Sequence, residues 1–231
     1  MKKKANKSSE LRYDLLSDDW VIISPNRAKR FNKEVNKVCP FCSIENQEKP
    51  VLVYSNGIKK DTSDLKGWTT IVVPNKYPIF TLSQKYKEER KGIYYKIKTA
   101  GFHELVITRN HGKSIALLSF KNIKEVLTCY QERINEFKKK GFVKGVFVFH
   151  NNGKDAGSTQ SYPHSQIVTT PLVDKEFRII LGNSENYFKE HNICFRCEES
   201  SREKKLKKRV VFENNNFIAY VPFAPKFTCQ V

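Results

Sequence analysis

The chain has 231 residues, of which 39% are hydrophobic and 12% aromatic, enough for one large domain or two small ones with a packed core. No apolar run reaches the roughly 18 residues of a membrane span, and no apolar segment follows the basic N-terminus as in a secretory signal. We therefore expect a cytoplasmic protein with no membrane partner. The formal net charge of +18 comes mostly from dispersed lysines, which indicates solvated surfaces and anionic small ligands rather than nucleic acid.

The residue pattern predicts strands and helices in alternation along the chain. Strands are expected up to Pro25 and over 68–73, 103–110, 145–151 and 165–171. Ser119 can cap a helix that Gly141 can end. Its apolar residues recur at helical spacing: Ile123, Val126, Leu127, Tyr130, Ile134 and Phe137. A second helix over 174–191 and two short strands over 209–214 and 216–223 complete the prediction.

Four of the six cysteines form two CxxC pairs, Cys39 with Cys42 and Cys194 with Cys197. In a chain without an export signal, such pairs indicate metal ligands before disulfides. Each pair precedes a strand that ends in Val-Pro, with a second proline soon after, which indicates a duplicated unit. The first unit runs from Cys39 to about residue 170, and the second has only residues 194–231. We therefore expect a fragment of a longer reading frame or a truncated copy.

His164 stands where a Gly/Ser loop enters a predicted strand, and its type allows a core residue, a metal ligand or a nucleophile. Upstream, "NNGKDAGST" offers backbone N–H groups that could approach a phosphate. Gln166 lies two residues further on, so both side chains share one face of the strand. An imidazole beside an amide donor and a glycine loop suits attack on phosphorus.

Six blocks resemble, in order, the galactose-1-phosphate uridylyltransferase family of the histidine-triad superfamily. They are "LRYDLLSDDWVIISPNRAKR", "CPFC", "VVPNKYP", "HELVITRNH", "FHNNGKDAGSTQSYPHSQI" and "NFIAYVPFAPKF". The resemblance implies an α+β fold with a histidine-triad-like antiparallel sheet, flanking helices and a tandem duplicated unit whose second copy is incomplete. It implies an N-terminal catalytic domain over 1–180 and the start of a C-terminal domain over 181–231.

The family hallmark His-Pro-His-x-Gln corresponds to Tyr162-Pro163-His164-Ser165-Gln166. The resemblance implies that His164 attacks the α-phosphorus of UDP-glucose, and that galactose 1-phosphate then accepts the uridylyl group, as in galactose metabolism. It also implies that the Tyr162 carbonyl holds the Nδ1–H of His164. An ADP-glucose or dinucleotide phosphorylase of the same superfamily is an alternative. A non-catalytic zinc-containing nucleotide-binding protein is another.

The resemblance also implies the remaining site residues. The catalytic residues are His164 and Gln166, and the nucleotide- and phosphate-binding residues are Arg27, Arg30, Asn75, Asn151, Gly157 and Thr159. A structural zinc ion is expected at Cys39, Cys42 and His111, with tyrosine at the fourth position. His103, His150 or water are the alternatives for that place. A second zinc site at Cys194 and Cys197 lacks its histidines. The partners implied are a nucleotide sugar, a sugar 1-phosphate and a second copy in a homodimer.

Overall fold

A computed structural model describes residues 9–25, 39, 41, 42, 44, 47–80, 87–98, 100–110, 112–152 and 162–231. The chain divides into two compact units, Met1–Asp174 and Lys175–Val231. The division falls just before helix α3 (Lys175–His191) and not at residue 180, because residues 175–180 form the first turns of that helix. Among the described helices, none combines the length and the apolar character needed to cross a membrane.

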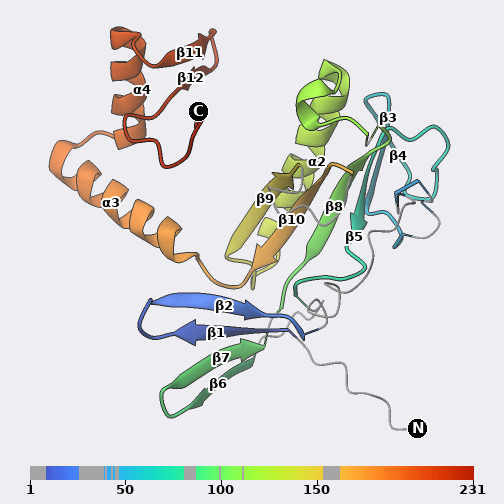
Figure 1. The fold of residues 1–231 in the computed structure, drawn as a ribbon, viewed down its shortest axis with the longest axis horizontal. Coiled ribbons are helices and arrows are strands. Elements are labelled where there is room, and N and C mark those ends of the chain that lie inside the picture. Colours follow the sequence, from blue (N-terminus) through green and yellow to red (C-terminus); the bar gives the residue numbers. More distant parts are fainter. Residues whose placement is uncertain are drawn as a thin grey trace. The chain divides into compact units, whose positions relative to one another are not determined.

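The first unit is built on a six-stranded antiparallel sheet with the order β4-β3-β5-β8-β10-β9 (Figure 1). Its strands are β3 (Leu52–Ser55), β4 (Ile58–Lys60), β5 (Thr70–Pro74), β8 (His103–Thr108), β9 (Gly145–Asn151) and β10 (His164–Thr170). The predicted strands at 68–73, 103–110, 145–151 and 165–171 are confirmed to within a few residues. β8 pairs with both β5 and β10, so it lies at the centre of the sheet.

Helix α2 (Phe120–Lys138) covers one face of this sheet, which we call the helix face. Val126, Cys129 and Phe137 of α2 pack there against Val106 and Ile167 of the sheet. The Ser119 side chain accepts the N–H of Asn122 and so caps the helix as predicted. The helix ends at Lys138, three residues before Gly141. A 3-10 turn, η2 (Ile115–Leu117), precedes it.

The other face, which we call the opposite face, carries the alternate side chains of the same strands. Leu105 and Ile107 of β8 pack there with Ile71 and Val73 of β5 and with Phe41 from the first CxxC segment. The strand register shows which face each residue of β10 belongs to, because Gln166 pairs with Leu105 and Ser165 pairs with Val106. Gln166 and His164 therefore belong to the opposite face, as predicted from their spacing, and Ser165 to the helix face.

A second, four-stranded antiparallel sheet has the order β2-β1-β7-β6. Its strands are β1 (Glu10–Asp14), β2 (Asp19–Ile23), β6 (Lys87–Lys91) and β7 (Tyr94–Lys98). Leu11 and Ile97 of this sheet share a buried cluster with Phe80 and with Val168 of β10. The second sheet therefore packs against the first near the strand that carries His164.

The second unit consists of α3, α4 (Phe195–Leu206) and a hairpin of β11 (Val210–Glu213) and β12 (Ile218–Tyr220). The helix and both strands predicted here are confirmed. Helix α4 was not predicted; Cys194 is its N-cap residue. The hairpin strands pair only with each other, and Phe212 and Phe217 are largely exposed. The two units together give antiparallel sheets with few helices, in line with the α+β prediction; the duplication itself stays a prediction.

Candidate functional site

His164 is the first residue of β10 and lies on the opposite face, with 9% of its surface exposed. Its Nδ1 lies 2.9 Å from the carbonyl oxygen of Tyr162. A carbonyl oxygen can only accept, so Nδ1 carries the proton and the lone pair of the neutral ring is on Nε2. This is the hydrogen bond that the family resemblance implied. Nε2 has no hydrogen-bond partner among the residues that the structure describes.

Burial controls the charge of this imidazole. Desolvation lowers the pKa of His164 below its usual value, and the hydrogen bond to the Tyr162 carbonyl only partly opposes the shift. At neutral pH the ring is therefore neutral, the form in which Nε2 can attack an electrophile.

The first CxxC segment packs against the His164 ring through Phe41. The Phe41 ring contacts the His164 ring edge-on, with centroids 5.1 Å apart. The segment is a tight turn: the Phe41 N–H approaches Cys39 Sγ at 3.3 Å, and the Cys42 N–H donates to the Cys39 carbonyl at 3.2 Å. Burial raises the pKa of the Cys39 thiol, although the hydrogen bond from Phe41 lowers it. Tyr162 packs against the cluster that contains Cys39 and Phe41.

Gln166 lies next to His103 of β8, which is 2% exposed. The Oε1 atom of Gln166 is 2.8 Å from His103 Nε2, and Asn75 Nδ2 is 3.0 Å from the same ring nitrogen. His103 Nδ1 accepts the backbone N–H of Ile79 at 3.1 Å. The structure thus brings together two predicted ligand-binding amides, Gln166 and Asn75, around a histidine to which no such role was assigned.

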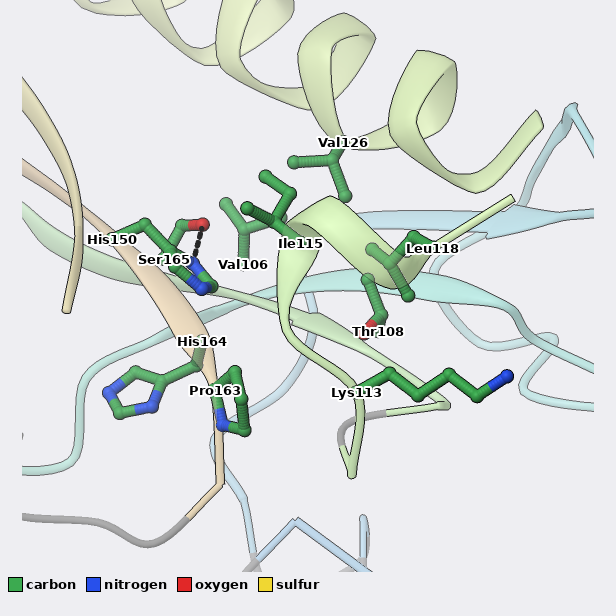
Figure 2. Close-up of a pocket in the computed structure, with 10 residues that line it drawn as sticks. All are labelled: Val106, Thr108, Lys113, Ile115, Leu118, Val126, His150, Pro163, His164 and Ser165. Atoms are coloured by element: carbon green, nitrogen blue, oxygen red, sulfur yellow. Dashed lines mark hydrogen bonds between the residues drawn. The ribbon is translucent and has the colours of Figure 1, made fainter. Parts of the chain in front are cut away.

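On the helix face, the side chains of Tyr130, Ser165 and His150 form a separate hydrogen-bonded series beside the position of His164 in β10. The Tyr130 hydroxyl donates to Ser165 Oγ, and Ser165 Oγ lies 2.9 Å from His150 Nδ1. His150 Nε2 is buried without a partner in the described residues. It borders a cavity of about 10 Å³ between β8, β10 and η2, which is at the lower limit for one water molecule. Figure 2 shows that the His164 ring points away from His150 and Ser165.

The predicted site residues divide into two groups. The structure brings His164 into contact with the Cys39–Cys42 turn, and Gln166 and Asn75 into contact with His103. The others lie outside the described residues: Arg27, Arg30, His111, Gly157, Thr159 and the side chain of Asn151. His103 was not assigned to the catalytic site because its contact with Gln166 depends on strand register. The pairing of 103–108 with 164–170 is the signal that could have found it.

The two histidines named as alternatives for the fourth zinc position have other partners in this structure. Both ring nitrogens of His103 make hydrogen bonds, to Ile79 and Gln166. His150 pairs with Ser165 on the helix face, whereas Cys39 packs on the opposite face. The identity of the fourth ligand therefore stays a prediction. Within the described residues no three His, Cys, Asp or Glu side chains gather as a metal site, and His111 lies outside those residues.

Comparison with known families gives one match that covers most of the chain. The model for galactose-1-phosphate uridyl transferase, N-terminal domain, matches residues 1–174. A galactose-1-phosphate uridylyltransferase of Thermotoga maritima is 28% identical over 226 residues, which cover 96% of this chain. An ADP-glucose phosphorylase of Arabidopsis thaliana is 29% identical over 239 residues, which cover 98% of this chain. The chain covers 65% of the length of each of these relatives.

Solved structures give the same two names. A structure titled as a uridylyltransferase superposes with a TM-score of 0.74 at 27% identity, over 94% of this chain and 63% of that one. An ADP-glucose phosphorylase from Arabidopsis thaliana with bound ADP-glucose superposes with a TM-score of 0.65 at 28% identity, over 94% of this chain and 65% of that one.

Proposed function

Because the chain belongs to the galactose-1-phosphate uridyl transferase family, we propose that it is a nucleotidyltransferase that moves a uridylyl group between UDP-hexose and hexose 1-phosphate. The reaction converts UDP-glucose and galactose 1-phosphate into glucose 1-phosphate and UDP-galactose, in galactose metabolism. The proposal places the nucleophile at Nε2 of His164.

The proposed reaction has two displacements at phosphorus. His164 Nε2 attacks the α-phosphorus of UDP-glucose; an N–P bond forms, and the P–O bond to glucose 1-phosphate breaks. In the second step an oxygen of the incoming hexose 1-phosphate attacks the same phosphorus, and the N–P bond breaks. The attacking phosphate is already an anion at neutral pH, so the step requires no strong general base.

One observation carries this proposal: His164 is buried, neutral and held through Nδ1, with Nε2 left without a protein partner among the described residues. The Tyr162 carbonyl fixes the tautomer and ring orientation before substrate binds.

A second candidate is an ADP-glucose phosphorylase, in which inorganic phosphate replaces the sugar 1-phosphate as acceptor. The relative from Arabidopsis thaliana with that name is as similar in sequence as the uridylyltransferase relatives. Both candidates pass through a nucleotidyl-histidine, so they differ in donor and acceptor but not in the role of His164. A non-catalytic zinc-containing nucleotide-binding protein would form no such adduct.

Intact mass spectrometry separates these functions. The chain is incubated with UDP-glucose or with ADP-glucose and denatured without acid, because phosphoramidates are acid-labile. We expect the mass of one uridylyl group with UDP-glucose; an adenylyl group with ADP-glucose alone would favour the phosphorylase. His164→Asn should abolish the adduct, and His191→Asn, an exposed histidine on α3, should not. No adduct with either donor, or an adduct retained in His164→Asn, would refute the proposed mechanism.

We further propose that Cys39, Cys42 and His111 bind a structural zinc ion. The adjacent thiols of the Cys39–Cys42 turn are soft donors of the kind that zinc prefers. Bound zinc would fix the turn that carries Phe41 against His164. The tyrosine at 162 leaves the family's fourth ligand position without a histidine. A second site at Cys194 and Cys197 would need ligands beyond these two.

Elemental analysis of protein produced with added zinc tests this site. We expect close to one zinc per chain, with a loss of most of it in Cys39→Ser and no loss in Cys229→Ser, an exposed cysteine outside both pairs. Tyr162→His should tighten zinc binding in a competition with a chelator. Metal-free protein with unchanged thermal stability would contradict the proposal.

A further inference from the structure

His103 is the one fully buried histidine in the described residues, and the chemistry proposed above gives it no role. It is 2% exposed and is the first residue of β8, in the middle of the six-stranded sheet. The register pairs His103 with Val168, so on the opposite face His103 and Gln166 are diagonal neighbours across two strands. The hydrogen bonds of its two ring nitrogens determine its protonation state and which groups it can hold in place.

The surroundings of Nδ1 fix the protonation state of His103. The Ile79 backbone N–H, which can only donate, lies 3.1 Å from Nδ1. Nδ1 must therefore be the unprotonated nitrogen, which excludes both the Nδ1–H tautomer and the imidazolium ion. The proton of the neutral ring is on Nε2.

The Nε2 proton in turn fixes the orientation of Gln166. Nε2–H can donate only to an acceptor, and Gln166 Oε1 is 2.8 Å away. Asn75 approaches the same atom with its nitrogen, since its Oδ1 accepts the Tyr77 N–H at 2.9 Å. Its NH₂ group is a donor, so it cannot accept the Nε2 proton. Gln166 is therefore the acceptor. With its oxygen bound to His103, the Gln166 amide presents its NH₂ group away from the ring, and this group has no partner among the described residues.

From this arrangement we propose that His103 is a positioning residue, which holds the Gln166 NH₂ group ready to donate to the phosphate that His164 attacks. The inference rests on the proposed function, and it explains why Gln166 acts as a donor and not as an acceptor. An amide that could rotate would first have to be turned by the phosphate until its NH₂ group, and not its oxygen, faced the anion. A donor fixed in advance costs no reorganisation during the reaction.

A double-mutant cycle on the rate of adduct formation tests the coupling. Gln166→Ala should slow the adduct by about 100-fold, as expected for loss of one preorganised donor. His103→Phe, which removes the Nε2–H donor, should slow it by at least tenfold in the wild-type background and by less than about twofold in the Gln166→Ala background. His103→Gln, which can again donate an N–H, should recover part of the rate. Equal effects of His103→Phe in both backgrounds would overturn the proposal.

A second measurement does not depend on catalysis or on the folding of any variant. In wild-type protein labelled with ¹⁵N-histidine, the His103 ring should show the Nε2–H tautomer at neutral pH. A proton on Nδ1 would overturn the proposal. Should the wild type form no adduct with UDP-glucose or ADP-glucose, the proposed function fails, and the ring tautomer still decides whether His103 orients Gln166.

Discussion

The two faces of the six-stranded sheet use buried polar side chains in different ways. On the helix face, Glu125 accepts hydrogen bonds from the Gly57 N–H and from the hydroxyls of Thr69 and Thr70, at 2.8 and 2.7 Å. Glu104 forms a bidentate ion pair with Arg133 of α2, with both N···O distances 2.7 Å. These buried carboxylates have protein partners and join the sheet to its helix.

On the opposite face, His164 and Gln166 are each bound through one end only. The protein holds His164 through Nδ1 and Gln166 through Oε1. Neither His164 Nε2 nor the Gln166 NH₂ group has a partner in the part of the chain that the structure describes. Polar groups that are paired at both ends contribute to stability, and those paired at one end can bind a ligand. The difference predicts that substitutions on the helix face lower stability and that those on the opposite face lower activity.

The largest effect on stability is expected for Glu125→Ala. Its side chain is 2% exposed. Its loss removes the acceptor of the buried Thr70 hydroxyl and two further hydrogen bonds, at a cost of about 3 kcal/mol in the free energy of unfolding. Urea unfolding followed by tryptophan fluorescence measures this, because both tryptophans, Trp20 and Trp68, belong to the first unit. Glu136→Ala, which removes an exposed glutamate of the same helix, should leave stability nearly unchanged. Equal losses in the two variants would contradict the distinction between the faces.

A smaller effect is expected for Ser165→Ala, which tests the two faces on adjacent residues. The substitution removes the acceptor of the Tyr130 hydroxyl and the hydrogen-bond partner of His150 Nδ1, so the free energy of unfolding should fall by about 1–3 kcal/mol. The rate of adduct formation, measured where the variant is folded, should stay within about twofold of the wild type. Gln166→Ala should do the reverse. A large loss of rate in Ser165→Ala would show that the helix face takes part in the reaction.

The sequence predicts apolar strands such as β5, β8, β9 and β10 but misses charged ones such as β6, for a physical reason. β5, β8 and β10 are rich in apolar and β-branched residues, because both faces of the sheet are largely buried along them. The edge strand β9 is apolar as well, with the sequence GVFVFHN. β6, with the sequence KEERK, has no apolar periodicity. It is held by backbone pairing with β7 and by ion pairs of Glu89 with Lys96 and Lys98. Helix α4 was missed likewise, because it has no apolar stripe and carries the Arg202–Glu198 ion pair on its surface.

The same reasoning applies to the candidate site. The common face of His164 and Gln166 follows from their spacing on one strand, so the sequence predicts it. The contact between His103 and Gln166 joins residues 63 positions apart. It requires the register of β8 against β10, which a single sequence does not specify. Local chemistry was therefore predictable, and the support from a neighbouring strand was not.

The smallest effect is expected for His150, a helix-face residue with one ring nitrogen that makes no hydrogen bond within the described residues. Its Nε2 is buried without a partner among the described residues, and burial, followed by the charge of His164, lowers its pKa. A group whose pKa is lower in the folded state binds fewer protons there than in the unfolded chain, so stability rises with pH across this window. Stability should therefore fall as the pH drops below the ordinary histidine value of about 6.5.

In His150→Gln the free energy of unfolding should fall less between neutral and mildly acidic pH than in the wild type, as measured by urea unfolding at each pH. His191→Asn, which removes an exposed histidine of the second unit, is the matched control and should keep the wild-type slope. An unchanged slope in His150→Gln would mean that the cavity beside Nε2 hydrates the imidazolium as well as bulk water does.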